Sequence, residues 1–151
     1  MLRAALDGLA GEPVRVLAAT NRRPLPPGTR VPANARLAPW LSYSRTMPRC
    51  AAVVCHAGMG TVGHALVAGV PVVASPGGGD MGETAARISW SETGVALPRR
   101  LTSARGVRLA VREVLAEPRY GRRASEVAAW ARDHPGPAAA ADEIEALGMA
   151  G

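Results

Sequence analysis

The segment His56-Ala57-Gly58-Met59-Gly60-Thr61 decides the fold assignment, because an apolar run leads into it and a helical pattern leaves it. Residues 51–55 form the apolar run, and residues 61–68 carry the helical pattern. A strand, a glycine-rich turn and a helix in this order point free backbone N–H groups and the positive helix end at one place, where a phosphate binds. Gly58 and Gly60 are expected to let the backbone turn sharply and a ligand approach closely. The expected diphosphate-binding residues are His56, Gly58, Gly60 and Thr61.

Two side chains add donors to this turn. Thr61 brings a hydroxyl to the first helical turn, and His56 brings an imidazole to the end of the strand. The alternative interpretation makes His56 a core histidine that caps the strand, with the glycines serving only a tight turn. We favour phosphate contact, because an anion explains why free N–H groups and a helix end are gathered there.

The rest of the chain alternates between helical and strand patterns. The apolar runs 51–55 and 70–75 are continuous, which is typical of strands buried on both faces of a parallel sheet. Further strands are expected over residues 14–20, 36–38 and 94–98, and helices over residues 2–9, 44–49, 61–68 and 80–90, with three more towards the C-terminus. The pattern predicts an α/β fold, a doubly wound, Rossmann-like parallel sheet with helices on both faces, over residues 1–151 as one domain. Its ligand crevice lies beyond the carboxyl ends of the strands, where His56 and Pro76 fall.

Composition narrows the function classes. The chain has 151 residues and a net charge of +6, and all its basic residues are arginines. These arginines are scattered singly or in pairs, and aromatic residues make up only 3% of the chain. A nucleic-acid-binding surface needs a basic patch and, for single strands, aromatic rings for stacking. The sequence therefore does not predict a nucleic-acid-binding protein.

The sequence also gives an expectation for localisation. Residues 1–7 lack the long apolar core of a signal peptide, and no apolar run approaches the roughly twenty residues that cross a membrane. Cys50 and Cys55 are too few for a disulfide framework, so reduced thiols are expected. We expect a cytoplasmic protein with no membrane span.

Five sequence elements, taken in order, resemble a known enzyme family. They are His56-x-Gly58-x-Gly60-Thr61, Gly69-Val70-Pro71, Pro76, Asp80 and Ala85-Ala86-Arg87. Together they resemble the nucleotide-sugar-binding domain of glycosyltransferases with the GT-B architecture. The likeness is to the UDP-glycosyltransferase-like group, which includes bacterial natural-product and macrolide enzymes. A glycine-rich turn alone is weak evidence, whereas five ordered elements over about thirty residues are specific.

The resemblance implies an activity and a division of labour. Such enzymes transfer a sugar from a UDP or TDP donor to a hydroxyl group of a small molecule, with inversion at the anomeric carbon and without a metal or other cofactor. They carry the acceptor site and the general base on an N-terminal domain, so no catalytic residue is expected in this chain. The resembled domain also opens with a strand before its first helix. The chain is therefore expected to be one half of a GT-B enzyme, without that strand, and to act with an N-terminal acceptor-binding domain or chain.

The resemblance also assigns further contacts. Trp40 and Leu41 are expected to flank the base, His64 stands where some relatives bind the ribose, and Asp80 stands where an acidic residue holds sugar hydroxyls. Met81 replaces a glutamine that grips the sugar in many relatives. Simpler interpretations remain open, because Trp40 also suits a core position. Asp80-x-x-Glu83 also has the pattern of a helix capping box.

Two other functions stay open at this point. One is a non-catalytic nucleotide-binding module that completes a partner chain. The other is a sugar-nucleotide epimerase, whose fold is related. An epimerase needs carboxylates around the sugar, and the sequence offers few of them, which favours the glycosyltransferase hypothesis.

Overall fold

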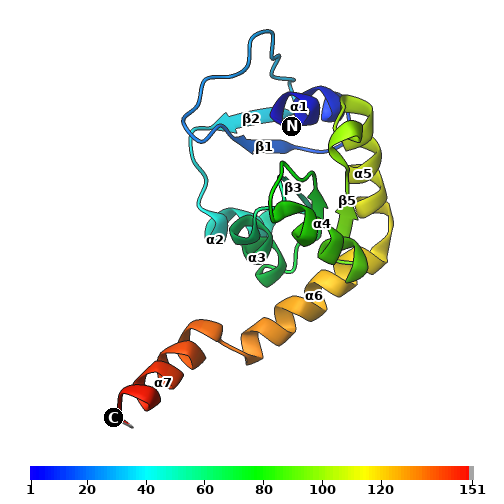
Figure 1. Cartoon of the computed structure of the whole chain (residues 1–151). Coiled ribbons are helices and arrows are strands. Elements are labelled where there is room, and N and C mark those ends of the chain that lie inside the picture. The colour runs from blue at the N-terminus through cyan, green and yellow to red at the C-terminus, as the bar shows by residue number, and fades with distance from the viewer. Residues whose placement is uncertain (150–151) are drawn as a thin grey trace.

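The computed structural model describes residues 1–149, apart from the side chains of residues 137, 138 and 149. Helices alternate with short strands along the chain, as the periodicity predicts (Figure 1). The strands are β1 (Val16–Ala19), β2 (Ala35–Ala38), β3 (Val53–Cys55), β4 (Val72–Ala74) and β5 (Gly94–Ala96). The helices are α1 (Leu2–Leu9), α2 (Tyr43–Thr46), α3 (Met59–Val67), α4 (Met81–Trp90), α5 (Ala104–Ala116), α6 (Pro118–Asp133) and α7 (Gly136–Met149), with 3-10 turns η1 (Met47–Arg49) and η2 (Arg99–Leu101).

All strand pairs are parallel, so the expected fold class is confirmed. The hydrogen bonds nevertheless fall into two ladders, β1–β2 and β3–β4–β5, instead of one continuous sheet. In the larger ladder Val72 of β4 pairs with Val53 on one side and with Gly94 on the other. β4 is therefore the central strand of that ladder, and its three residues are buried.

Helices cover both faces of the sheet, as a doubly wound fold requires. Successive strand residues point to opposite faces. Val72 and Ala74 pack in one apolar cluster with residues of α3 and α4, whereas Val73 packs in a second cluster with residues of α1, α5 and α6. The two clusters form the core on either side of β4.

The observed strands are shorter than the apolar runs. The run at 70–75 pairs as a strand only over Val72–Ala74, because α3 ends in a hydrogen-bonded cap. Gly69 has a left-handed φ of 73° and its N–H donates to Leu66, while the N–H of Val70 donates to Ala65. These two bonds form a Schellman motif, in which Val70 belongs to the cap of α3 and not to the strand.

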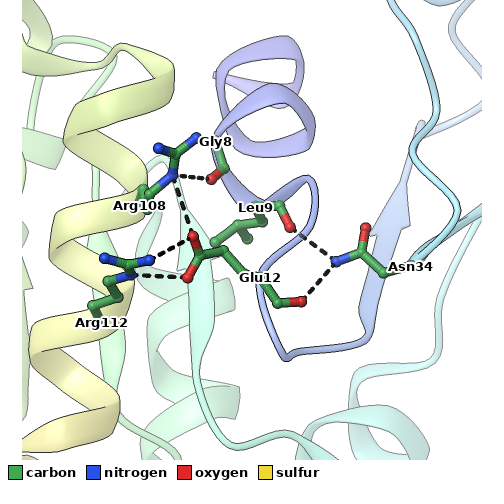
Figure 2. A network of polar contacts seen from close by, with 6 residues as sticks. All are labelled: Gly8, Leu9, Glu12, Asn34, Arg108 and Arg112. Atoms are coloured by element: carbon green, nitrogen blue, oxygen red, sulfur yellow. Dashed lines mark hydrogen bonds and ion pairs between the residues drawn. The ribbon is translucent and has the colours of Figure 1, made fainter.

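A polar network fastens α1 and the loop after it to α5 (Figure 2). Arg108 Nε donates to the carbonyl of Gly8 over 2.8 Å, and Arg112 donates two bonds of 2.8 and 2.9 Å to the carboxylate of Glu12. From the other side, Asn34 Nδ2 donates to the carbonyl of Leu9 over 2.9 Å. Only 11% of the Glu12 side chain is exposed, so the network lies close against the core.

Glu12 is expected to make the folded chain less stable in acid. The hydrogen bond from Arg112, aided by the charges of Arg112 and Arg108, holds the pKa of Glu12 below its usual value of 4.5. A carboxyl group with a lowered pKa stabilises the folded state above its unfolded-state pKa, and this stabilisation is lost as the pH falls through the folded-state pKa. Urea unfolding at a series of pH values below about 5 should therefore show a steeper loss of stability for the native chain than for Glu12→Gln. Identical slopes for the two proteins would contradict the assignment.

The C-terminal helices lead away from the sheet. α6 packs against α3, and its residues Ala124 and Ala128 are buried. α7 projects beyond the rest of the molecule (Figure 1). Within residues 1–149, none of the helices is both long enough and apolar enough to cross a bilayer.

Candidate functional site

The expected diphosphate turn and the glycine-rich loop 76–80 leave the sheet at neighbouring points. Cys55, the last residue of β3, pairs with Ala74, the last residue of β4. The Ser75 N–H donates to the Cys55 carbonyl over 2.8 Å, which fixes the two chain segments beyond the strands. The Ser75 side chain is buried, and its hydroxyl lies 2.6 Å from that of Thr102. The two loops therefore start from a rigid base.

The sharp turn after β3 depends on Ala57, so the prediction that Gly58 and Gly60 supply it is wrong. Ala57 has a φ of 65° and is completely buried, whereas Gly58 has an ordinary φ of −66° and Gly60 lies inside α3. A left-handed alanine costs roughly 1–2 kcal/mol. Strain of this kind persists where the surroundings enforce it, and it gathers at functional sites.

The two glycines instead leave room for the groups beside them. A Cβ at Gly58 would lie 2.6 Å from Nε2 of His56, so a side chain there would displace the imidazole. A Cβ at Gly60 would meet nothing within 4 Å, so the space beside Gly60 in the first turn of α3 is open. The first intrahelical bond joins the Val62 N–H to the Gly58 carbonyl over 3.1 Å. The N–H groups of Met59, Gly60 and Thr61 therefore stay available for a ligand.

Next to this turn lies a hollow of about 350 Å³ that contains the residues expected near the nucleoside. Trp40 and Leu41 come from the segment after β2, and His64 comes from the second turn of α3. The Trp40 side chain is 63% exposed, which argues against the alternative that it fills the core. The full lining is Ala19, Asn21, Trp40, Leu41, Ser42, Tyr43, Ser44 and His64.

Tyr43 joins the hollow to the turn, and the sequence analysis missed it. Its ring meets the His64 ring edge-on at 5.6 Å, and its hydroxyl lies 3.3 Å from the hydroxyl of Thr61. Asn21 was missed as well; it follows β1 with a left-handed φ of 53°. Both could have been found from their positions in the sequence. Tyr43 comes three residues after Trp40, and Asn21 comes two residues after β1, where an asparagine tolerates a left-handed backbone.

Asp80 does not cap α4 with its side chain, so the capping-box alternative is wrong. Asp80 stands at the N-cap with helical backbone angles and makes no side-chain cap hydrogen bond. Glu83 binds Arg87 instead, over 2.6 Å. Asp80 is exposed, so its carboxylate is available to a ligand, whereas Met81 is half-buried and packs against the apolar cluster under α3 and α4.

The site offers hydrogen-bond donors that suit an anion, and neither a reactive thiol nor a metal cluster accompanies them in the described residues. Burial raises the pKa of the Cys55 thiol, with a backbone hydrogen bond from Ala57 acting in the opposite direction. Cys55 is therefore a protonated core residue at neutral pH and not a nucleophile. Across residues 1–149 no group of three His, Cys, Asp or Glu side chains is arranged to hold a metal ion.

Comparison with known proteins gives one family. The family model described as "Erythromycin biosynthesis protein CIII-like, C-terminal domain" matches residues 3–147. The chain is 40% identical over 121 residues to 4'-demethylrebeccamycin synthase of Lentzea aerocolonigenes, covering 80% of this chain and 28% of that protein. It is 35% identical over 143 residues to aklavinone 7-beta-L-rhodosaminyltransferase of Streptomyces galilaeus, covering 95% of this chain and 32% of that protein.

The comparison of structures also leads to a glycosyltransferase. The crystal structure of CalG4, the calicheamicin glycosyltransferase, superposes with a TM-score of 0.85 at 27% identity, over 96% of this chain and 37% of that one. The chain thus spans about a third of the length of the proteins that it matches. Residues from the expected diphosphate turn and the hollow lie within the matched region.

Proposed function

Since the chain belongs to the family of erythromycin biosynthesis protein CIII-like C-terminal domains, the donor-binding domains of glycosyltransferases, we propose that it binds a UDP or TDP sugar for transfer, with inversion, to a hydroxyl group of a small molecule. The observation that carries this proposal is the open N-terminus of α3 beside His56. The family members named above act on natural products, which supports an acceptor of that class. The acceptor site and general base are proposed to come from an N-terminal domain or chain.

The diphosphate is proposed to lie on the turn at residues 56–61. Free N–H groups of Met59, Gly60 and Thr61 would donate to its oxygens, and the exposed imidazole of His56 would donate from the side. Hydrogen bonds to a charged group contribute about 1.5–3 kcal/mol each, and the helix end adds roughly 0.3–1 kcal/mol. These donors favour the leaving diphosphate as its charge develops, so we propose transfer without a metal ion. Micromolar to millimolar donor binding corresponds to about 4–8 kcal/mol, which these donors can supply.

The nucleoside is proposed to occupy the hollow next to the turn. Trp40 offers an exposed aromatic face for the base, and His64 lies on the same helix as the diphosphate donors. The Tyr43–Thr61 contact keeps the two parts of the site together. Beyond the turn, the free carboxylate of Asp80 is proposed to accept hydrogen bonds from the sugar hydroxyls. Met81, which stands in place of the glutamine of many relatives, packs into the apolar cluster and offers no hydrogen bond to the sugar.

Replacement of His56 by alanine is expected to weaken binding of UDP or TDP roughly 10- to 150-fold, which corresponds to the loss of one charge-assisted bond. Binding of uridine or thymidine should change far less, because these nucleosides lack the phosphates. Calorimetric titration of the four ligands against the native chain and His56→Ala measures the difference. If the nucleosides lose as much affinity as the nucleotides, His56 has a structural role and not a phosphate-binding one.

Trp40→Ala should lack this selectivity and weaken the binding of nucleosides and nucleotides alike. Stacking of a base on an aromatic ring contributes about 1–3 kcal/mol, so a loss of roughly 5- to 150-fold is expected for both classes of ligand. Trp130→Ala is the matched control, because Trp130 is also 63% exposed but lies on α6 and stacks on His134 at 4.4 Å. Equal affinity of Trp40→Ala and Trp130→Ala for UDP would place the base elsewhere.

A further inference from the structure

The positive charge of this chain is concentrated in one segment. Residues 13–79 contain seven arginines and no aspartate or glutamate, whereas in the rest of the chain twelve carboxylates outnumber eleven arginines. All seven arginines of the segment are exposed. Every ion pair found within residues 1–149 involves an arginine outside the segment. The segment therefore carries the entire positive net charge, and no ion pair compensates it.

Three of these arginines stand next to residues that line the hollow beside the diphosphate turn. Arg22 and Arg23 directly follow Asn21, and Arg45 directly follows Ser44. Consecutive Cα atoms lie about 4 Å apart, and the screening length in 0.1 M salt is about 10 Å, so these charges act on the hollow. We call Arg22, Arg23 and Arg45 the cationic rim.

The turn after β1 holds part of this rim in a fixed position. Asn21 and Arg22 both have left-handed φ angles, of 53° and 60°. The Arg22 N–H donates to the Pro39 carbonyl over 3.0 Å, which ties the turn to the segment that carries Trp40. A left-handed arginine is unfavourable, and strain of this kind persists where the surroundings enforce it and gathers at functional sites.

The lining of the hollow offers no carboxylate that would neutralise the rim. None of the eight residues around it is acidic. Along the chain the nearest carboxylates are Glu12, which is bonded to Arg112, and Asp80 at the start of α4. A cleft with charge of one sign and low-dielectric walls concentrates the electric field and raises the association rate of an oppositely charged ligand by about 10- to 1,000-fold. The ligand that suits this hollow is therefore an anion.

We propose that the cationic rim recruits the anionic donor, so that Arg22, Arg23 and Arg45 raise the rate at which a nucleoside diphosphate enters the site. This inference rests on the proposed function, which places a diphosphate at residues 56–61. A nucleoside diphosphate is a multiply charged anion, whereas the nucleoside is uncharged, so the rim acts on the first and not on the second. Rim charges change the association rate and its salt dependence, whereas the contacts of the bound complex set the dissociation rate.

Stopped-flow fluorescence with TDP tests the inference, because Trp40 in the hollow serves as a reporter. The triple variant Arg22→Gln/Arg23→Gln/Arg45→Gln should associate roughly tenfold or more slowly than the native chain at 10 mM salt, and less than about twofold more slowly at 1 M salt, since the screening length falls from about 30 Å to 3 Å. Its dissociation rate constant and its affinity for thymidine should stay unchanged. Lysine at the same three positions keeps the charge and should restore the native association rate.

The matched control is Arg105→Gln/Arg122→Gln/Arg132→Gln. These three arginines are exposed and lie on α5 and α6, and none forms an ion pair with another residue of the described range 1–149. Both triple variants have the same net charge, so the comparison isolates the position of the charge from its amount. The control should associate with TDP at the native rate, and equal rates for the two glutamine variants would overturn the inference.

Two further results would also overturn it. One is a loss of association rate that lysine does not restore, because the effect would then depend on guanidinium geometry and not on charge. The other is faster dissociation with unchanged association, which would assign the rim arginines to direct ion pairs in the complex. If the native chain binds no TDP, the proposed function fails and the inference falls with it, whereas TDP binding at one rate by all the proteins overturns the inference alone.

Discussion

Gly60→Val is expected to lower the affinity of the chain for UDP and TDP by at least about 100-fold while leaving the fold intact. The structure separates these two effects, because a Cβ at Gly60 meets nothing within 4 Å. The valine branch would stand where the diphosphate approaches the free N–H groups of Gly60 and Thr61. Loss of two charge-assisted bonds of about 1.5–3 kcal/mol each gives a decrease of this size.

Gly121→Val is the matched control for that experiment. Gly121 lies early in α6, its Cβ would also meet nothing within 4 Å, and the nearby Arg119 bonds to Glu92, which follows the C-terminal end of α4. Both variants replace a helical glycine by a better helix former, so circular dichroism should report folded proteins and calorimetry should separate them. A folded Gly60→Val protein that binds UDP as well as Gly121→Val does would exclude the turn as the diphosphate site.

The second large effect concerns turnover. The 151-residue chain on its own is expected to bind donors but to form no glycoside over multiple turnovers. In residues 1–149 neither His56 nor His64 is hydrogen-bonded to a carboxylate, so neither has the orienting partner of a general base. Base catalysis contributes about 10²–10⁴-fold, and acceptor positioning contributes up to roughly 7–11 kcal/mol. The proposal draws both from an N-terminal domain or chain.

Glycoside formation is measured by incubating the purified chain with UDP-glucose, TDP sugars and a panel of phenolic and macrolide acceptors. Slow hydrolysis of the donor is the most that is expected, and His56→Ala should slow it further. Robust multiple-turnover glycoside formation with no second protein present would show that acceptor binding and base catalysis reside in these 151 residues.

The sequence predicted the architecture well, because apolar periodicity reports burial directly. The continuous runs before His56 and Pro76 became the adjacent strands β3 and β4, and the helical pattern after Thr61 became α3. The family resemblance is confirmed by the match over residues 3–147. Periodicity could not predict the separation into two ladders, since it reports which face of a strand is buried but not which neighbour the strand pairs with. The expectation that a first strand is absent came from the family resemblance alone.

Local backbone chemistry was harder to predict. Glycine is the usual left-handed residue, so the turn was assigned to Gly58 and Gly60, whereas tertiary packing imposes that conformation on the buried Ala57. The spacing of Asp80 and Glu83 fits a capping box, but Glu83 pairs with Arg87 one turn later. Such outcomes depend on competition between partners that spacing alone does not rank.

The diphosphate turn at the start of α3 is the central claim, and an NMR titration of the ¹⁵N-labelled chain with TDP tests it most directly. We predict saturable shifts that are largest at the N–H groups of Met59, Gly60 and Thr61, with smaller shifts at Tyr43 and His64 in the hollow, and with thymidine moving only the latter pair. Saturable binding whose largest shifts fall outside residues 56–61, or no binding at millimolar TDP, would contradict the account.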